Sequence, residues 1–356
     1  MLGHVQLLGL DVLEPSWKVT GLTVFTFFMF FVQHYASFSF LTTHLDMFDV
    51  FTECFSISAV GLEIVIRIGL LLHHRKLLNE TIEMIRNQNK LFGNSEAIKK
   101  LATRFHKLVA ATLHTIAVIY LSTMMFELIP IVYPDPKKSN LPLALYIPYL
   151  PHDGAPYWHL NYAFHTIMNF ICVSFLLAVD GMLVLSIMAA VYQIKELKVT
   201  IQELDTGAEQ TALNRELVRI IQIHQSIKHF VHQLEQTYYL DLMVDFGFVC
   251  LILCMGLNVI AVDVMHPIGF FLMSAAFQLF ILCFCGNLLL IESDSLSNCA
   301  YSIDWHVMPV PEQKLLMVLI AHAQKPQVLR GIFMPLIMSS FISVIKASYS
   351  YFTLLH

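Results

Sequence analysis

The last apolar stretch of the sequence carries polar side chains at a regular helical spacing. One face of a helix between Gly331 and Leu355 would hold Ser339, Ser343, Lys346, Ser350 and Thr353, which follow one another at intervals of 4, 3, 4 and 3 residues. Such a stripe favours either close packing of helices through small hydroxyl groups or the lining of a water-filled path. The stripe alone leaves both interpretations open.

Ionisable side chains also occur inside other long apolar runs, where lipid makes them costly and usually paired or functional. Glu63 and Arg67 are four residues apart, so on a helix they can neutralise each other. Asp180 lies in the middle of another apolar run, 162–192, without a partner nearby in the sequence. We interpret it as a structural hydrogen-bonding aspartate, and coupling of an ion to transport is the alternative.

Motifs of catalysis do not stand out. The sequence shows no phosphate-binding loop, zinc-protease motif, nucleophile elbow or dinucleotide fingerprint, so we predict neither an enzyme nor a bound cofactor. His224, His229 and His232 share one helical stretch, but His224 falls on an apolar seam, which argues against a metal site. The seven cysteines lie in or beside apolar runs and are expected to be free thiols.

Composition sets the class of protein. Of 356 residues, 57% are hydrophobic and 13% are charged, whereas a soluble chain carries about a quarter charged residues. We predict an all-α membrane protein with a single seven-helix domain over 1–356 and no nucleic-acid partner. The expected spans are approximately 19–41, 48–72, 108–131, 162–192, 240–262, 267–291 and 331–355.

The positions of lysine and arginine predict the orientation. The N-terminal arm and the loops after the second, fourth and sixth spans hold 17 of the 21 Lys and Arg residues. Basic residues favour the cytoplasmic side, so we expect a cytoplasmic N-terminus and an extracellular C-terminus. This polarity is opposite to that of a G-protein-coupled receptor.

A heptad seam precedes the fifth span. Its members are spaced alternately by 4 and 3 residues, as in a coiled coil: Leu213, Leu217, Ile220, His224, Ile227, Val231, Leu234 and Tyr238. We therefore predict a cytoplasmic anchor made of helices at about 193–239 and 293–330. Its assembly contacts, within or between subunits, are assigned to Ile220, His224, Ile227, Val231 and Leu234.

Rings and thioethers gather in the outer halves of four spans. Aromatic and methionine clusters with few polar groups suit a small apolar ligand. The predicted ligand contacts are Phe51, Phe55, Tyr120, Met124, His165, Met168, Asn169, Phe271 and Phe277.

The C-terminal half of the chain resembles one family. The run Lys346-Ala-Ser-Tyr-Ser-Tyr-Phe-Thr-Leu-Leu355 is similar to the terminal signature of insect odorant receptors, and Lys325-Pro326 with Gly331-Ile-Phe-Met-Pro335 resembles that family's approach to the last helix. Further similarity lies in Gln278-Leu-Phe280, Gly286, Trp305, Asp180 and His224 with Leu234-Glu235. The first third of the chain matches mainly in the layout of its spans.

The resemblance implies a subunit of an odorant-gated, non-selective cation channel in the plasma membrane of olfactory sensory neurons. It implies a heterotetramer with the odorant co-receptor, a volatile odorant as ligand and a pore lined by the last helix. The pore and gate residues would be Ser343, Lys346, Ser350, Thr353 and Leu354, with Leu354 at the gate. Lys346 is unusual in a cation pore, so we expect it to snorkel outward or to be offset by partner subunits. A secondary transporter and, further off, a G-protein-coupled receptor are the alternative classes.

Overall fold

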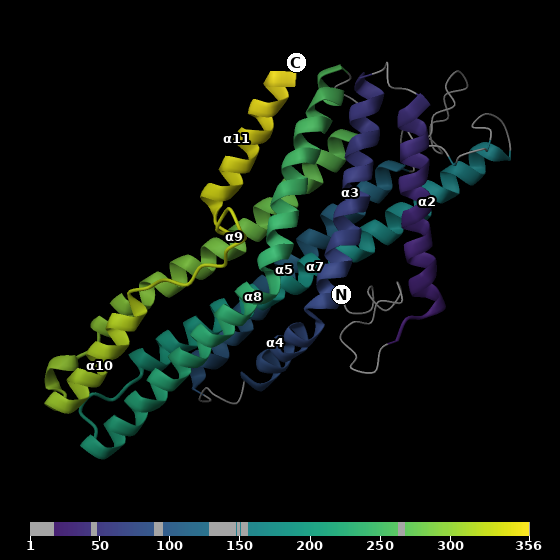
Figure 1. The fold of residues 1–356 in the computed structure, drawn as a ribbon. Coiled ribbons are helices and arrows are strands. Elements are labelled where there is room, and N and C mark those ends of the chain that lie inside the picture. Colours follow the sequence, from purple (N-terminus) through teal and green to yellow (C-terminus); the bar gives the residue numbers. More distant parts are fainter. Residues whose placement is uncertain are drawn as a thin grey trace.

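The chain folds into long helices. The computed structural model describes residues 18–43, 48–88, 95–127, 147, 150, 156–262 and 268–355. Its helices are α2 (Gly21–Thr43), α3 (Phe48–His73), α4 (Arg75–Gln88), α5 (Glu96–Glu127), α7 (Tyr157–Gln202), α8 (Gln210–Val262), α9 (Ile268–Tyr301), the 3-10 helix η1 (Trp305–Val307), α10 (Val310–Ala323) and α11 (Met338–Leu355). Figure 1 shows them side by side in one bundle that extends toward α10 at the lower left.

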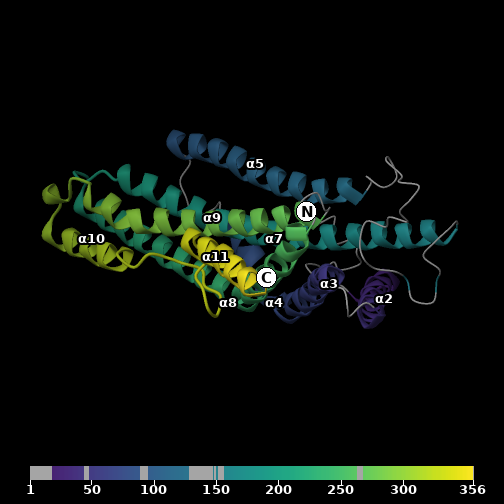
Figure 2. The same ribbon diagram turned by 90° about the horizontal axis from the view of Figure 1, so that it is seen from above.

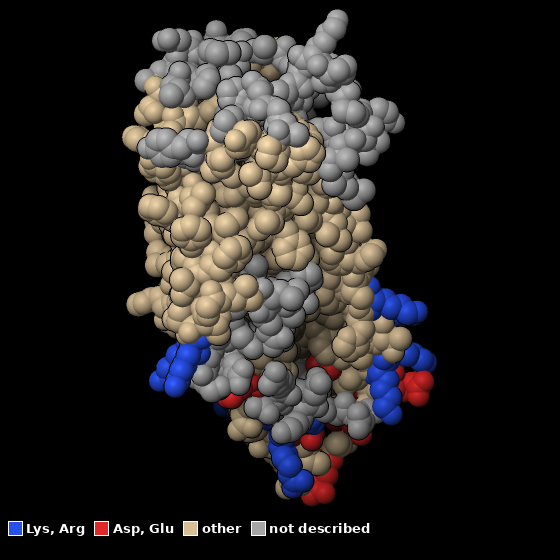
Figure 3. All heavy atoms as spheres, turned by 90° about the vertical axis from the view of Figure 1, so that its right-hand side faces the viewer, with Lys and Arg blue, Asp and Glu red and all other residues tan. Residues whose placement is uncertain are grey.

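Within the described residues, α2, α3, α5, α7, α8 and α9 are long and apolar enough to cross a membrane. The seventh predicted span is α11, which is amphipathic because of its serines and Lys346. On the face drawn in Figure 3, Lys, Arg, Asp and Glu gather at the lower end of the molecule below a broad uncharged band. This confirms the predicted all-α class of multi-pass membrane protein with seven spans.

Two helices are much longer than a membrane is thick. At 1.5 Å per residue, the 46 residues of α7 and the 53 residues of α8 span about 69 and 80 Å, against a hydrocarbon core of about 30 Å. Both therefore continue beyond the bilayer without a break, and in Figure 1 they meet α9 and α10 there. The predicted anchor stretches 193–239 and 293–330 fall in these extensions, together with η1, α10 and the hairpin that follows.

Polar contacts fasten the helices of this extension to one another. Lys198 Nζ on α7 donates to Glu292 Oε2 on α9 at 2.6 Å. Glu312, at the start of α10, is 1% exposed and accepts from Asn214 Nδ2 at 3.3 Å and from Gln210 Nε2 at 3.4 Å, both on α8. The buried carboxylate of Glu312 and the half-buried one of Glu292 thus each have a hydrogen-bond donor from a different helix, as burial of charge requires.

Two elements differ from the sequence prediction. The helix α4 was not predicted; it buries Leu78 and Thr81 and packs against α7 and α8 with this narrow face. The last helix begins at Met338 rather than at Gly331, because the chain before it closes a tight hairpin. In that hairpin Leu336 N donates to Leu329 O at 2.8 Å and Gly331 N donates to Met334 O at 2.9 Å.

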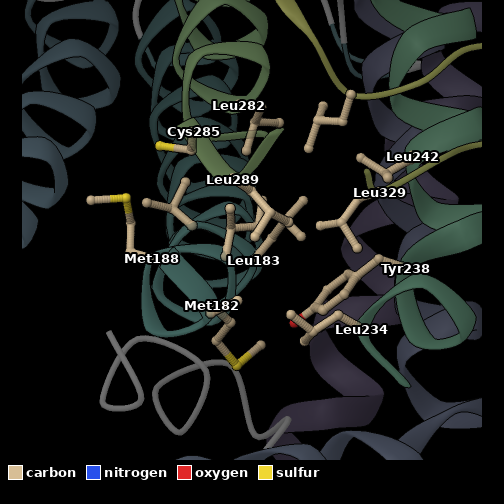
Figure 4. Close-up of a cluster of buried hydrophobic side chains, with 14 of the residues drawn as sticks. Met182, Leu183, Met188, Leu234, Tyr238, Leu242, Leu282, Cys285, Leu289 and Leu329 are labelled. Carbon is tan, nitrogen blue, oxygen red and sulfur yellow. The ribbon is translucent and has the colours of Figure 1, made fainter. Parts of the chain in front are cut away.

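The hairpin docks into the core at two glycines. A Cβ on Gly286 of α9 would lie 2.1 Å from the carbonyl oxygen of Leu336, and one on Gly331 would lie 3.4 Å from Cβ of Leu242 on α8. In Figure 4, Leu329 points into the same apolar cluster as Leu242 and Leu289. The absence of a side chain at position 286 therefore lets the backbone before α11 rest directly on α9.

We predict that Gly286→Ala disrupts the seating of α11. The added methyl group meets backbone atoms, which cannot rotate away. The free energy of unfolding should therefore fall by at least the roughly 1–3 kcal/mol typical of overpacking. The measurement is the melting temperature of the purified protein in detergent. Gly247→Ala on α8 is the control, because its Cβ meets nothing within 4 Å. It should be neutral or stabilise by up to about 1 kcal/mol, as alanine does in helices. Equal melting temperatures for both variants would contradict the prediction.

Candidate functional site

A single arginine lies at the centre of a buried charge network. The Nε of Arg67 donates to Asp241 Oδ1 at 2.9 Å, and Nη2 donates to Asp241 Oδ2 at 3.1 Å and to Asp180 Oδ1 at 2.6 Å. The Nη1 of the same side chain donates to Glu63 Oε1 at 3.3 Å and to Asp245 Oδ1 at 3.2 Å. The Arg67 side chain is 0% exposed, and the four carboxylate side chains are at most 8% exposed.

Two neutral side chains extend the network to further helices. The hydroxyl of Tyr120 on α5 donates to Asp180 Oδ2. The amide of Gln278 on α9 donates to Asp245 Oδ1 at 2.9 Å. Hydrogen bonds thus connect α3, α5, α7, α8 and α9 in the middle of the bundle. Such an arrangement holds these five helices in register.

The sequence revealed only part of this network. The predicted pair of Glu63 and Arg67 forms, and Asp180 has the hydrogen-bonding role expected of it. The prediction missed Asp241 and Asp245, which also bind the guanidinium. The sequence did contain an indication of them, since the two aspartates lie four residues apart inside the predicted fifth span, 240–262, where charged residues are costly.

Most of the predicted ligand contacts lie in or against the core of the bundle. Tyr120, His165 and Met168 are buried, Phe55, Met124, Phe271, Phe51 and Asn169 are half-buried, and Phe277 is 40% exposed. The rings of Phe51 and Phe55 stack with centroids 6.2 Å apart. Tyr120 uses its hydroxyl within the charge network. Phe277 points to the outside of the bundle, and its ring centroid is 5.6 Å from that of Phe280.

The last helix has two different faces. Val344 and Ser348 are buried, and the Ser348 hydroxyl lies 3.3 Å from the carbonyl oxygen of Cys250 on α8. On the same side, Phe341 contacts Phe280 of α9 edge to face, with centroids 5.6 Å apart. The opposite face is exposed in the single chain and carries the whole predicted stripe of Ser339, Ser343, Lys346, Ser350 and Thr353, together with Leu354 at 78% exposure. Figure 2, seen from above, shows α11 next to α8 and α9, the two helices that it contacts.

The heptad seam is packed inside the subunit. All eight members are at most 6% exposed: Leu213, Leu217, Ile220, His224, Ile227, Val231, Leu234 and Tyr238. The helix α8 contacts α7, α9 and α10, so these side chains fill the interior of the single chain. An effect of Ile220, Ile227, Val231 or Leu234 on assembly would therefore act through the fold of this extension.

The one histidine of the seam is adapted to that interior. Burial, with Lys228 and His322 nearby, lowers the pKa of His224 to about 4. A histidine ordinarily titrates near pH 6.5, so His224 is neutral at pH 7 and packs like an apolar residue. Its position on the seam is thus compatible with the hydrophobic pattern around it.

We predict that removal of the central cation destroys the fold. Arg67→Met leaves four buried carboxylates without a counter-charge, and breaking a buried ion pair costs about 3–5 kcal/mol. The variant should be lost from the monodisperse peak in size-exclusion chromatography. Arg219→Met is the control, because that side chain is 39% exposed and pairs with Glu216 at 3.1 Å on the surface. A surface pair contributes less than about 1 kcal/mol. Recovery of folded Arg67→Met at the level of the control would contradict a central role.

Comparison with known proteins gives the family. The family model described as "7tm Odorant receptor" matches residues 47–349. One relative is Odorant receptor 85c of Drosophila melanogaster, which is 25% identical over 61% of this chain and 57% of its own length. Another is Odorant receptor 10 of Aedes albopictus, which is 25% identical over 61% of this chain and 60% of its own length. The matches thus span somewhat more than half the length of these two relatives. Odorant receptor Or2 of Anopheles gambiae is 22% identical over 82% of this chain and 80% of its own.

Solved structures share the fold. The insect olfactory receptor OR5 from Machilis hrabei, in complex with eugenol, superposes with a TM-score of 0.80 over 99% of this chain and 98% of its own, at 13% identity. A second structure of the same receptor gives a TM-score of 0.80 over 96% of this chain and 90% of its own, at 14% identity. The family is one of receptors and not of enzymes. With a family match over most of its length, the chain belongs to the odorant receptors of the insect type.

Proposed function

We propose that the chain is the odorant-sensing subunit of a ligand-gated, non-selective cation channel. It would work with the odorant co-receptor in a heterotetramer in the plasma membrane of olfactory sensory neurons. The observation that carries the proposal is the polar stripe of α11, which faces away from the helices of its own subunit. A polar face on a membrane helix requires either water or a further protein surface against it. A pore at the centre of several subunits supplies both.

The ligand would be a small, volatile, apolar molecule. The set Phe51, Phe55, Tyr120, Met124, His165, Met168, Asn169, Phe271 and Phe277 supplies rings and thioethers with few polar groups. A site of that kind recognises its ligand mainly by shape and dispersion. Support also comes from the Machilis hrabei receptor, whose structure was solved in complex with eugenol. Since Tyr120 already donates to Asp180, it would contribute mainly its ring to the ligand site.

Binding and opening would be coupled through α9. This helix carries Phe271 and Phe277, contacts α11 through Phe280 and supports the hairpin before α11 at Gly286. A ligand that favours one position of α9 over another would shift the population of α11 positions by its difference in affinity for the two states. The outer end of α11, with Leu354, would then form a dry apolar constriction in the closed channel.

Whole-cell recording tests the proposed function. The chain is expressed with and without an insect odorant co-receptor, and a panel of volatile alcohols, esters and phenols is applied. We expect fast inward currents that reverse near 0 mV and need both chains. Saturable substrate uptake without conductance would favour a transporter, and currents that depend on guanine nucleotides would favour a G-protein-coupled receptor; either result would overturn the proposal.

We predict that Met168→Ala changes the order of ligand potency. Met168 is 5% exposed in the outer part of α7, so its truncation enlarges the proposed site. Met188→Ala is a matched control, because Met188 is 1% exposed on the same helix but lies farther in, in the cluster of Figure 4. Both changes should cost roughly 2–5 kcal/mol of stability, as burial of methionine predicts. Only Met168→Ala should change the order of potency among the ligands of the panel. An unchanged ranking in Met168→Ala at matched surface expression would place the site elsewhere.

We predict that Leu354→Ser increases current in the absence of ligand or lowers the ligand concentration needed, because a hydroxyl lets water enter the constriction. Leu354→Phe should reduce the current. Leu121→Ser on α5 is the control, since Leu121 is 52% exposed on a helix without the polar stripe. Basal current, sensitivity and ion selectivity equal to wild type in both Leu354 variants would remove this residue from the pore.

A further inference from the structure

The charge network around Arg67 contains more acidic groups than it can neutralise. Glu63, Asp180, Asp241 and Asp245 surround one guanidinium, and all five side chains are buried. Full ionisation of the four carboxyl groups would leave three uncompensated negative charges within a membrane-spanning bundle. Each uncompensated buried charge costs several kcal/mol. Positive charge beyond that of Arg67, as bound protons or cations, must therefore reduce this excess, and the described residues within hydrogen-bond distance of the four carboxyl groups supply none.

The hydrogen bonds of Arg67 are distributed unevenly over the four carboxyl groups. A guanidinium has five N–H donors, and each donor of Arg67 is used once. Asp241 receives two of them in the bidentate geometry that suits a carboxylate. Asp180 receives the shortest, at 2.6 Å, and is also the acceptor for Tyr120. Glu63 and Asp245 receive one long bond each, at 3.3 and 3.2 Å.

Asp245 is the acidic group with an unsatisfied atom. It is 1% exposed, and its Oδ1 accepts from Arg67 and from Gln278. Its Oδ2 is buried and has no hydrogen-bond partner among the described residues. The titratable or charged groups that act on it are Glu63 and Arg67 on α3, Tyr120 on α5, Asp180 on α7, Asp241 on its own helix and Cys283 on α9. Arg67 is the one cation of that set, and its donors are all occupied.

We propose that the network is a proton-binding site, with a proton from solvent held on Oδ2 of Asp245. A neutral carboxyl group there leaves Oδ1 as acceptor for both existing donors and lowers the excess charge by one. It also removes an ionised group from the contact of α8 with Gln278 of α9. Loss of the proton would place an uncompensated charge at this contact. The protonation state of Asp245 would then control how firmly α9 is held, and α9 supports α11.

Two substitutions four residues apart on α8 test this directly. Asn has the shape of a protonated aspartate, so Asp245→Asn should melt within about 2 °C of wild type, whereas Asp241→Asn removes a bidentate anion and should lower the apparent melting temperature by about 5 °C or more. An equal fall in melting temperature for the two variants would overturn the proposal, because it would show that Asp245 is bound as an anion.

A second measurement uses the unmodified protein. Raising the pH from 7 to 9 should destabilise wild type, because it removes the proton, and should affect Asp245→Asn less.

Infrared spectroscopy of the purified receptor at pH 7 should show the carbonyl stretch of a protonated carboxyl group that shifts in D₂O and is absent in Asp245→Asn. Absence of that band in wild type would overturn the proposal. A wild-type stability that depends on Na⁺ or K⁺ when these replace a large organic cation would also overturn it, and would identify a metal cation as the missing charge.

Discussion

The guanidinium of Arg67 is the interaction on which the arrangement of the bundle depends. Hydrophobic burial holds helices together weakly in lipid, because lipid tails are as apolar as the side chains they would replace. Directional hydrogen bonds to a buried cation supply what that burial lacks, a defined rotation for each helix. Four of the five hydrogen bonds that Arg67 donates reach α7 and α8 from α3, and Tyr120 and Gln278 add α5 and α9. The network therefore sets which side of each of these helices faces its neighbours in the bundle.

Local patterns predicted the helices and much of the packing. The alternating spacing of the seam correctly identified the buried face of α8, and the interval of four residues identified the pair of Glu63 and Arg67. The partners on α7 and α8 could not be assigned in this way. Asp180 is 113 residues from Arg67, and Asp241 and Asp245 are 174 and 178 residues away. Their meeting depends on how the spans are arranged in the bundle, which periodicity along one helix does not specify.

The start of the last helix shows the same limit. Hydrophobicity from Gly331 onward predicts a span of the full length, but the hairpin bonds between Leu329 and Leu336 and the contact with Gly286 delay the helix to Met338. The stripe itself was predicted correctly as a face, since all five members are exposed on α11. Whether that face meets water or another helix could not be inferred from spacing, because small hydroxyl residues serve both purposes.

The unbroken course of α7 and α8 has a mechanical consequence. An α-helix is stiff over its length, so each of these two acts as a rod that crosses the membrane and continues into the anchor. Asp180, Asp241 and Asp245 tie both rods to Arg67 partway along. A tilt of about 5° around that point would move a position about 35 Å away along the rod by about 3 Å. The buried arginine would thus act as a pivot. In the proposed channel, a small displacement near the ligand would become a larger one at the far end of the anchor.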